Sequence, residues 1–163
     1  MRRPNNKVCR AFTLLELFAV LIVLGLISTI AVISVLGHLD QSELMRMSHL
    51  LASADRKERE ATRLSPIAGG LSIDRSKQRL QYSCSARTVD FSRNVRLAEV
   101  IVGSPTFGND GILFSQSGQS PTYAFRLESR RGASNWILIV GLTGQVLVSD
   151  NSDEVRSLLA MGR

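Results

Sequence analysis

The sequence predicts an α+β fold, in which one long N-terminal helix packs on an antiparallel β-sheet head. Two observations predict this fold. The residues from Phe12 to about Leu64 contain no proline and follow helical patterns. After Gly70, short apolar or alternating runs are separated by turn signals, which is typical of strands. The chain of 163 residues has the length of one domain.

The first half of the predicted helix is apolar on all sides. Between Leu17 and Leu36 there are 20 residues without a charge. They would form about 30 Å of helix, which is the thickness of the hydrocarbon core of a bilayer. The run is also longer than the roughly 7–15 apolar residues of a secretory signal. We therefore predict that residues 12–36 are a retained transmembrane helix and not part of a removed signal peptide.

The residues before this helix, 1–11, are basic. They hold four Lys or Arg residues and no acidic ones, so that basic and acidic residues nearly balance in the rest of the chain. Basic residues before an apolar span keep that end in the cytoplasm. Most of the net charge of +6 is therefore a targeting feature, and the chain after Leu36 is expected to lie across the membrane.

Residues 37–65 are predicted to continue the helix as an amphipathic segment. Apolar residues recur there at roughly helical spacing, with charged residues between them, which predicts one apolar stripe and one solvated charged face. Asp55 and Arg59 are spaced as an i,i+4 ion pair on that charged face. Pro66 and then Gly69 and Gly70 are expected to end the helix.

Residues 66–150 are predicted to form the head, with roughly six to eight short strands. The predicted strands are 71–73, 79–83, 88–91, 95–102, 112–114, 123–127, 135–140 and 145–149. Residues 151–163 are expected to form a short C-terminal helix or tail. Asn151 would cap this helix, with Glu154 completing a capping box.

Glu16 lies near the start of the apolar run. A carboxylate in the hydrocarbon region costs on the order of 2.5–3.5 kcal/mol and usually has a partner. Cleavage between Ala11 and Phe12 would create an α-amine four residues before Glu16, either in the same chain or in a neighbouring copy. Alternatively, Glu16 reaches out of the membrane edge in an ordinary signal anchor, and the residues alone leave both interpretations open.

The segment Ala11-Phe12-Thr13-Leu14-Leu15-Glu16 resembles the processing site of type IV prepilins and of type II secretion pseudopilins. The resemblance implies that prepilin peptidase cuts between Ala11 and Phe12, that the new amine of Phe12 is methylated, and that Glu16 guides subunit addition. It covers Arg10 to about Leu36. Ala11 stands where the family nearly always has Gly.

The head is similar, over shorter stretches, to the H-type minor pseudopilin (general secretion pathway protein H) and to its relative, the T-type fimbrial minor pilin. The similar stretches are residues 114–118, 123–127 and 136–148. This resemblance implies a pilin-like fold and a structural, non-enzymatic subunit of the secretion pseudopilus in the inner membrane, with the head in the periplasm. The implied partners are prepilin peptidase, other pseudopilins or pilins bound through the helix, and the inner-membrane assembly platform.

Two other functions fit the residues: a minor pilin of a type IV pilus, with or without DNA binding, and an unrelated signal-anchored periplasmic protein. Arg126, Arg130 and Arg131 are the candidate nucleic-acid contacts. A solvated hairpin end is the preferred interpretation of these arginines, because Glu128 interleaves and no aromatic platform is evident. No motif of an enzyme, cofactor site or metal site is evident, so no catalytic residue, cofactor or metal ligand is predicted.

Overall fold

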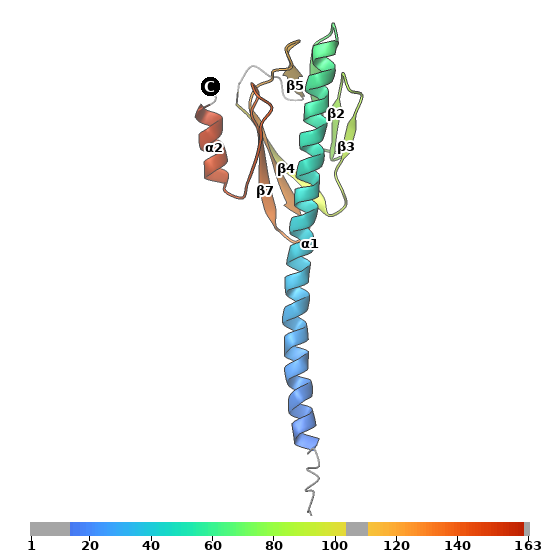
Figure 1. Ribbon diagram of the computed structural model, residues 1–163, viewed down its shortest axis with the longest axis vertical. Helices are drawn as coiled ribbons and strands as arrows, with labels where there is room; N and C mark the ends of the chain where they lie inside the picture. The colour runs from blue at the N-terminus through green and yellow to red at the C-terminus, as the bar shows by residue number, and fades with distance from the viewer. Residues whose placement is uncertain (1–13, 104–110, 162–163) are drawn as a thin grey trace, which may run out of the picture. The chain divides into compact units, whose positions relative to one another are not determined.

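The computed structural model describes residues 14–103 and 111–161, without the side chains of residues 30–36. The chain divides into two compact units, Met1–His38 and Leu39–Arg163. Helix α1, Leu14–Leu64, contributes to both units, and the strands all belong to the second. Figure 1 shows α1 in blue to green, followed by the strands of the head.

Helix α1 ends where the sequence predicts it. The amide of Ser65 donates to the carbonyl of Thr62 at 3.2 Å, and Pro66 follows, which disfavours helical backbone at Ser65. The start of the predicted helix, Phe12 and Thr13, lies outside the described residues.

The eight strands of the described residues form two antiparallel sheets of four strands each. The order in the first sheet is β3-β2-β1-β5 and in the second β4-β6-β7-β8. Their bounds are β1 Gly69–Asp74, β2 Arg79–Tyr82, β3 Thr88–Asp90, β4 Val95–Val102, β5 Gly111–Phe114, β6 Tyr123–Ser129, β7 Ser134–Ile139 and β8 Val146–Ser149. The predicted antiparallel head is confirmed, and its division into two sheets is new information from the structure.

The main core of the head lies between both sheets and the second half of α1. The buried side chains of α1 in this core are Leu44, Met47, Leu51 and Ala54. From β6, Tyr123, Phe125 and Leu127 point to the same side. The apolar stripe predicted from helical spacing is therefore what joins α1 to the sheets.

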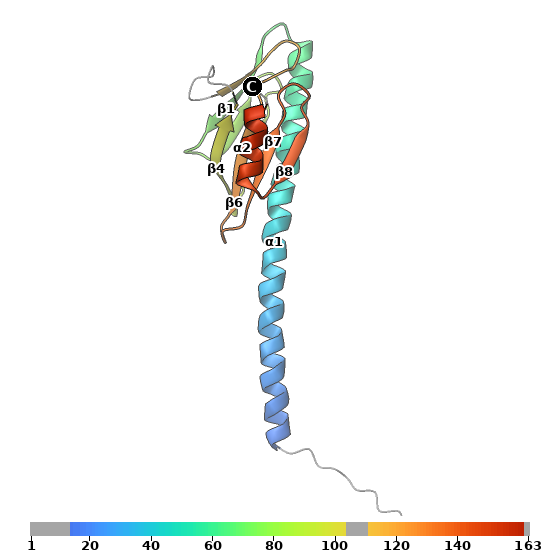
Figure 2. The ribbon, with the colours of Figure 1, turned by 90° about the vertical axis from the view of Figure 1, so that its left-hand side faces the viewer.

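Strand β7 is apolar on consecutive residues because both of its faces are covered. Ile137 and Ile139 belong to the main core, whereas Trp136 and Leu138 belong to a second cluster with Val155 and others. This second cluster is closed by helix α2, Ser152–Met161, which Figure 2 shows in red next to β7 and β8.

The cap of α2 differs in part from the predicted capping box. Asn151 does cap the helix, since its side-chain oxygen accepts the amide of Asp153 at 2.9 Å. Glu154 instead accepts the hydroxyl of Ser149 at 2.6 Å, and that same hydroxyl oxygen accepts the amide of Asn151. Ser149, and not Glu154, therefore accepts the backbone amide of the capping residue Asn151.

Candidate assembly surface

The first stretch of α1, residues 14–29, exposes every one of its side chains. Eleven of them are large and apolar, with exposed fractions from 46% at Val20 to 79% at Leu15. Burying one such side chain is worth about 1.5–3 kcal/mol. A surface of this kind has a strong tendency to be covered by lipid or by another protein.

Glu16 is the one charged residue in the stretch 14–29, and its side chain is exposed. The structure thus places the predicted assembly residue in the first turn of α1, among exposed apolar side chains. The predicted cleavage site, Ala11 and Phe12, lies outside the described residues, so cleavage and methylation stay predictions.

The predicted membrane span is not confirmed. Within the part of the chain that the structure describes, no helix combines the length and the apolar character that crossing a membrane requires. The predicted span 12–36 includes residues 12–13, which are not described, and residues 30–36, whose side chains are not described.

A second stretch of α1, residues 55–59, buries charged side chains inside the head. Asp55, Glu58 and Arg59 expose 1%, 0% and 5% of their surface. The prediction of a solvated face was wrong for these three residues. Both sheets close over this turn of the helix, and each of the three side chains finds polar partners there.

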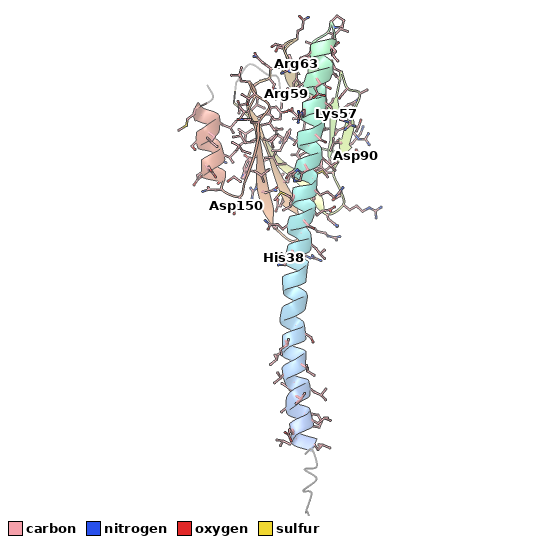
Figure 3. All side chains as sticks on the ribbon, in the orientation of Figure 1. His38, Lys57, Arg59, Arg63, Asp90 and Asp150 are labelled. Atoms are coloured by element: carbon pink, nitrogen blue, oxygen red, sulfur yellow. The ribbon has the colours of Figure 1, made fainter. Side chains whose placement is uncertain are left out.

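Arg59 is the centre of the first buried group (Figure 3). Its Nε donates to Asp55 at 2.7 Å, its Nη1 donates to the carbonyls of Gly118 and Gly141 at 2.9 and 2.7 Å, and its Nη2 donates to Ser120 Oγ at 2.9 Å. The guanidinium also lies 5.2 Å from the ring centre of Phe114. One side chain of α1 therefore holds the loop after β5 and the turn after β7.

Tyr123 completes this group, because its hydroxyl donates to the second oxygen of Asp55. Burial, together with the nearby charge of Asp55, raises the pKa of Tyr123 well above its usual value. Tyr123 therefore stays protonated and remains a hydrogen-bond donor at neutral pH. Both oxygens of Asp55 are thus satisfied inside the head.

Gly118 is required for this arrangement. Its φ of +75° lies in the left-handed region, and a Cβ atom there would come within 2.6 Å of Arg63 Nε and 3.0 Å of the carbonyl of Arg59. Glycine lets the loop approach α1 closely enough to accept the hydrogen bond from Arg59.

Glu58 is the centre of the second buried group. Its carboxylate accepts the backbone amides of Gly70, Cys84 and Ser85 at 3.3, 2.9 and 2.7 Å. Burial by itself raises the pKa of Glu58, but the hydrogen bonds to the carboxylate outweigh burial, so the pKa lies below its usual value of 4.5. Glu58 remains ionised and holds the loop after β2 against α1.

The candidate nucleic-acid contacts are only partly brought together. Arg130 and Arg131 lie in the hairpin between β6 and β7. Together with Arg93, which precedes β4, and Arg96 of β4, they line one open cavity of about 780 Å³. We call it the arginine cavity. Arg126 is not among its lining residues.

Arg126 lies within β6, where its register partner is Trp136. Its Nε is buried and has no hydrogen-bond partner in the described structure. Arg93 and Arg96 were missed by sequence reasoning. The only local signal was that Arg93 and Arg96 lie three positions apart in the sequence. Their place beside the β6–β7 hairpin depends on the long-range β4–β6 register, which brings Arg96 next to Glu128.

Across the described ranges 14–103 and 111–161, no group of three or more His, Cys, Asp or Glu side chains could hold a metal ion. The buried carboxylates are instead bonded to arginine, tyrosine and backbone amides. The chemistry of the head is thus that of a packed scaffold, with charged side chains used to fix loops on a helix.

The fold of this chain is similar to that of a solved protein structure. The minor pseudopilin EpsH from the Type 2 Secretion System of Vibrio cholerae matches with a TM-score of 0.51, over 66% of this chain and 96% of the EpsH chain. The identity is 12%. The chain has the fold of a minor pseudopilin. No protein-family model matches the sequence, and no curated protein matches it significantly.

The pseudopilin fold was predicted from the resemblance of residues 10–36 and, less specifically, from three stretches of the head that lie mostly in strands. Residues 114–118 begin at the end of β5, residues 123–127 are part of β6, and residues 136–148 run from β7 into β8. Residues 114–118 and 136–148 include Gly118 and Gly141, whose carbonyls accept hydrogen bonds from Arg59.

Proposed function

We propose that the chain is a minor pseudopilin, a non-enzymatic structural subunit of the pseudopilus of a type II secretion system. One observation supports this proposal most strongly. A head with the fold of a minor pseudopilin follows a helix whose residues 14–29 expose eleven large apolar side chains and the carboxylate of Glu16. A helix with such a surface is suited to packing beside other helices in a filament.

The proposed assembly step is an ion pair between subunits. Prepilin peptidase would cut after Ala11, and the α-amine of Phe12 would be positively charged near neutral pH. Glu16 of a subunit at the assembly platform would bind the amine of its neighbour, while the apolar side chains around it exclude water. An ion pair is much stronger in such a low-dielectric surrounding than in water, so Glu16 would set the register between helices.

We also propose that residues 12–36 hold the subunit in the inner membrane before assembly, with the head in the periplasm. The uncharged run from Leu17 to Leu36 and the basic residues before it support this step. Flotation of the full chain with vesicles of neutral lipid tests it. Failure to float would remove the membrane step and leave the helix as a protein-binding element only.

Replacing Glu16 tests the assembly step. Glu16→Ala should leave the amount and the folding of the chain unchanged but lower its crosslinking to neighbouring subunits and lower secretion at least tenfold, because the charge partner of the amine is lost. Glu16→Asp is the matched control and should retain part of the crosslinking and part of the secretion. Normal crosslinking and secretion by Glu16→Ala would refute the proposal.

Sequencing the N-terminus of the chain recovered from membranes tests the processing step. A start at Phe12 is expected, together with a mass increase of one methyl group. A start at Met1 would place the chain with ordinary signal-anchored proteins. Deletion of the chain distinguishes the two filaments: loss of exported enzymes supports the pseudopilus, whereas loss of surface fibres with normal export would identify a minor pilin.

A further inference from the structure

The backbone around the arginine cavity is held in place. The amide of Arg130 donates to the carbonyl of Asn94 at 2.9 Å, which ties the β6–β7 hairpin to the segment before β4. The hairpin itself is closed by bonds between Ser129 and Ala133 and between Gly132 and Ser129, with Gly132 at a φ of +91°. The four arginines therefore extend from a fixed frame.

The positive charge of the cavity is only partly neutralised. Arg96 pairs with Glu128 at 2.9 Å, and Arg131 pairs with Asp40 of α1 at 3.4 Å. Within the described residues, neither Arg93 nor Arg130 forms an ion pair, and both side chains are exposed. The other acidic residue of α1 at this end, Glu43, is paired with Arg46.

The cavity lies close to the end of the uncharged run along the chain. Arg131 contacts Asp40, and Asp40 follows Leu36 by four residues. Even a fully extended backbone spans only about 14 Å over four residues. If the run ends at the membrane surface, the arginines are held within reach of the lipid headgroups.

We propose that the arginine cavity binds the headgroups of anionic phospholipids, and so orients the head on the membrane before the subunit is extracted into the filament. This proposal rests on the membrane step of the proposed function. Guanidinium groups bind phosphate through paired hydrogen bonds, and basic residues at an anionic surface add binding energy individually.

The lining of the cavity favours lipid over nucleic acid. Sequence-independent binding of single strands uses aromatic side chains on which bases stack. The one aromatic residue of the lining, Phe91, is partly buried and packs against the main core. The cavity thus supplies phosphate ligands without a surface for bases.

Hydrogen exchange of the full chain in two bilayers tests this proposal. The protein is reconstituted in vesicles of phosphatidylcholine alone and of phosphatidylcholine with phosphatidylglycerol at about 7:3. We expect the amides of residues 92–94 and 129–133 to exchange about fivefold more slowly in the anionic bilayer. Residues 141–145 of the same head are the internal control and should exchange equally in both.

Two double variants with the same net charge distinguish binding at the arginine cavity from a general attraction of the basic chain to anionic lipid. The double variant Arg93→Gln and Arg130→Gln should lose the protection, whereas Arg56→Gln and Arg87→Gln should retain it, because Arg56 and Arg87 do not line the cavity. The emission of Trp136, the single tryptophan of the chain, shows whether each variant is folded.

Three results would overturn the proposal. Equal exchange in the two bilayers would exclude a lipid contact. Protection by soluble glycerol 3-phosphate in the neutral bilayer would indicate a pocket for small anions. Protection by a DNA oligonucleotide, without any effect of lipid, would indicate a nucleic-acid surface. Flotation on neutral vesicles is measured first, so failure of the membrane step is recognised separately.

Discussion

Two stretches of the same helix contrast in what they expose. Residues 14–29 of α1 expose apolar side chains, whereas residues 55–59 bury Asp55, Glu58 and Arg59. Each arrangement is unfavourable by itself. Exposed apolar surface loses the hydrophobic free energy of burial, and buried charges lose their hydration.

The two stretches differ in where their partners are. The buried charges find theirs inside the chain, in Tyr123, in loop carbonyls and in backbone amides. Among the described residues, no side chains bury the apolar stretch, whose large apolar residues are all at least 46% exposed. We therefore propose that the second stretch serves folding and the first serves association, so substitutions in the two should affect different measurements.

Arg59→Met should have the largest effect on the head. It removes the charge but keeps an unbranched side chain, and it leaves Asp55 buried without a cation, the carbonyl of Gly118 without its donor from Arg59, and the carbonyl of Gly141 with the amide of Ser120 alone. Breaking a buried pair from one side costs about 3–5 kcal/mol. Urea unfolding in a nonionic detergent, followed by the emission of Trp136, measures this loss.

Arg63→Met is the control for Arg59→Met. Arg63 is exposed and donates to one carbonyl, that of Ser117 at 3.0 Å, so the loss should stay below about 1 kcal/mol. Adding Asp55→Asn to Arg59→Met should cost less than the sum of the two, with a coupling of about 0.5–3 kcal/mol. Additive effects would show that the pair is not what stabilises the turn.

Glu58→Gln should have the next largest effect, about 1–3 kcal/mol at pH 7. The amide group of glutamine brings donors to a site that is surrounded by the backbone amides of Gly70, Cys84 and Ser85. The matched control is Glu60→Gln, since Glu60 is exposed and its one ion pair in the described residues is a surface pair with Arg56 at 3.6 Å. Urea unfolding at several pH values compares the two variants.

The pH dependence distinguishes these variants further. Because the pKa of Glu58 in the folded head is lower than the usual 4.5, its contribution to stability is present above pH 4.5 and is lost as pH falls toward the folded value. The wild type and Glu60→Gln should therefore lose stability over this range. Glu58→Gln should show a shallower decline, and an identical decline would exclude this role of Glu58.

The helix and the strands could be predicted because their signals are local. The strands predicted at 71–73 and 123–127 are present as β1, Gly69–Asp74, and β6, Tyr123–Ser129, each slightly longer than predicted. The C-terminal end of α1, before Pro66, and the start of α2, after Asn151, could be predicted for the same reason. The apolar stripe predicted from helical spacing contains the core residues Leu44, Met47 and Leu51. Leu39, Leu50 and Leu64 belong to the same stripe but are exposed.

The buried charges could not be predicted, because their environment is set by long-range contacts. Asp55, Glu58 and Arg59 stand in an unbroken run of six charged residues, 55–60, and such a run normally indicates a solvated face. Arg59 donates hydrogen bonds to Gly118 and Gly141, which lie 59 and 82 positions further along the sequence. Helical spacing does place the three on two adjacent turns, but it carries no information on which sheet covers them.

Leu21→Gln should have the smallest effect on the head and a large one on association. Leu21 is 56% exposed, so the free energy of unfolding of the head should change by less than about 0.5 kcal/mol. The same change at Leu51, which is fully buried in the main core, should cost more than about 2 kcal/mol. Crosslinking between subunits should fall for Leu21→Gln although the head is intact. Loss of stability at Leu21, or unchanged crosslinking, would mean that the first stretch of α1 is not the association surface, and the contrast between the two stretches would then reflect folding alone.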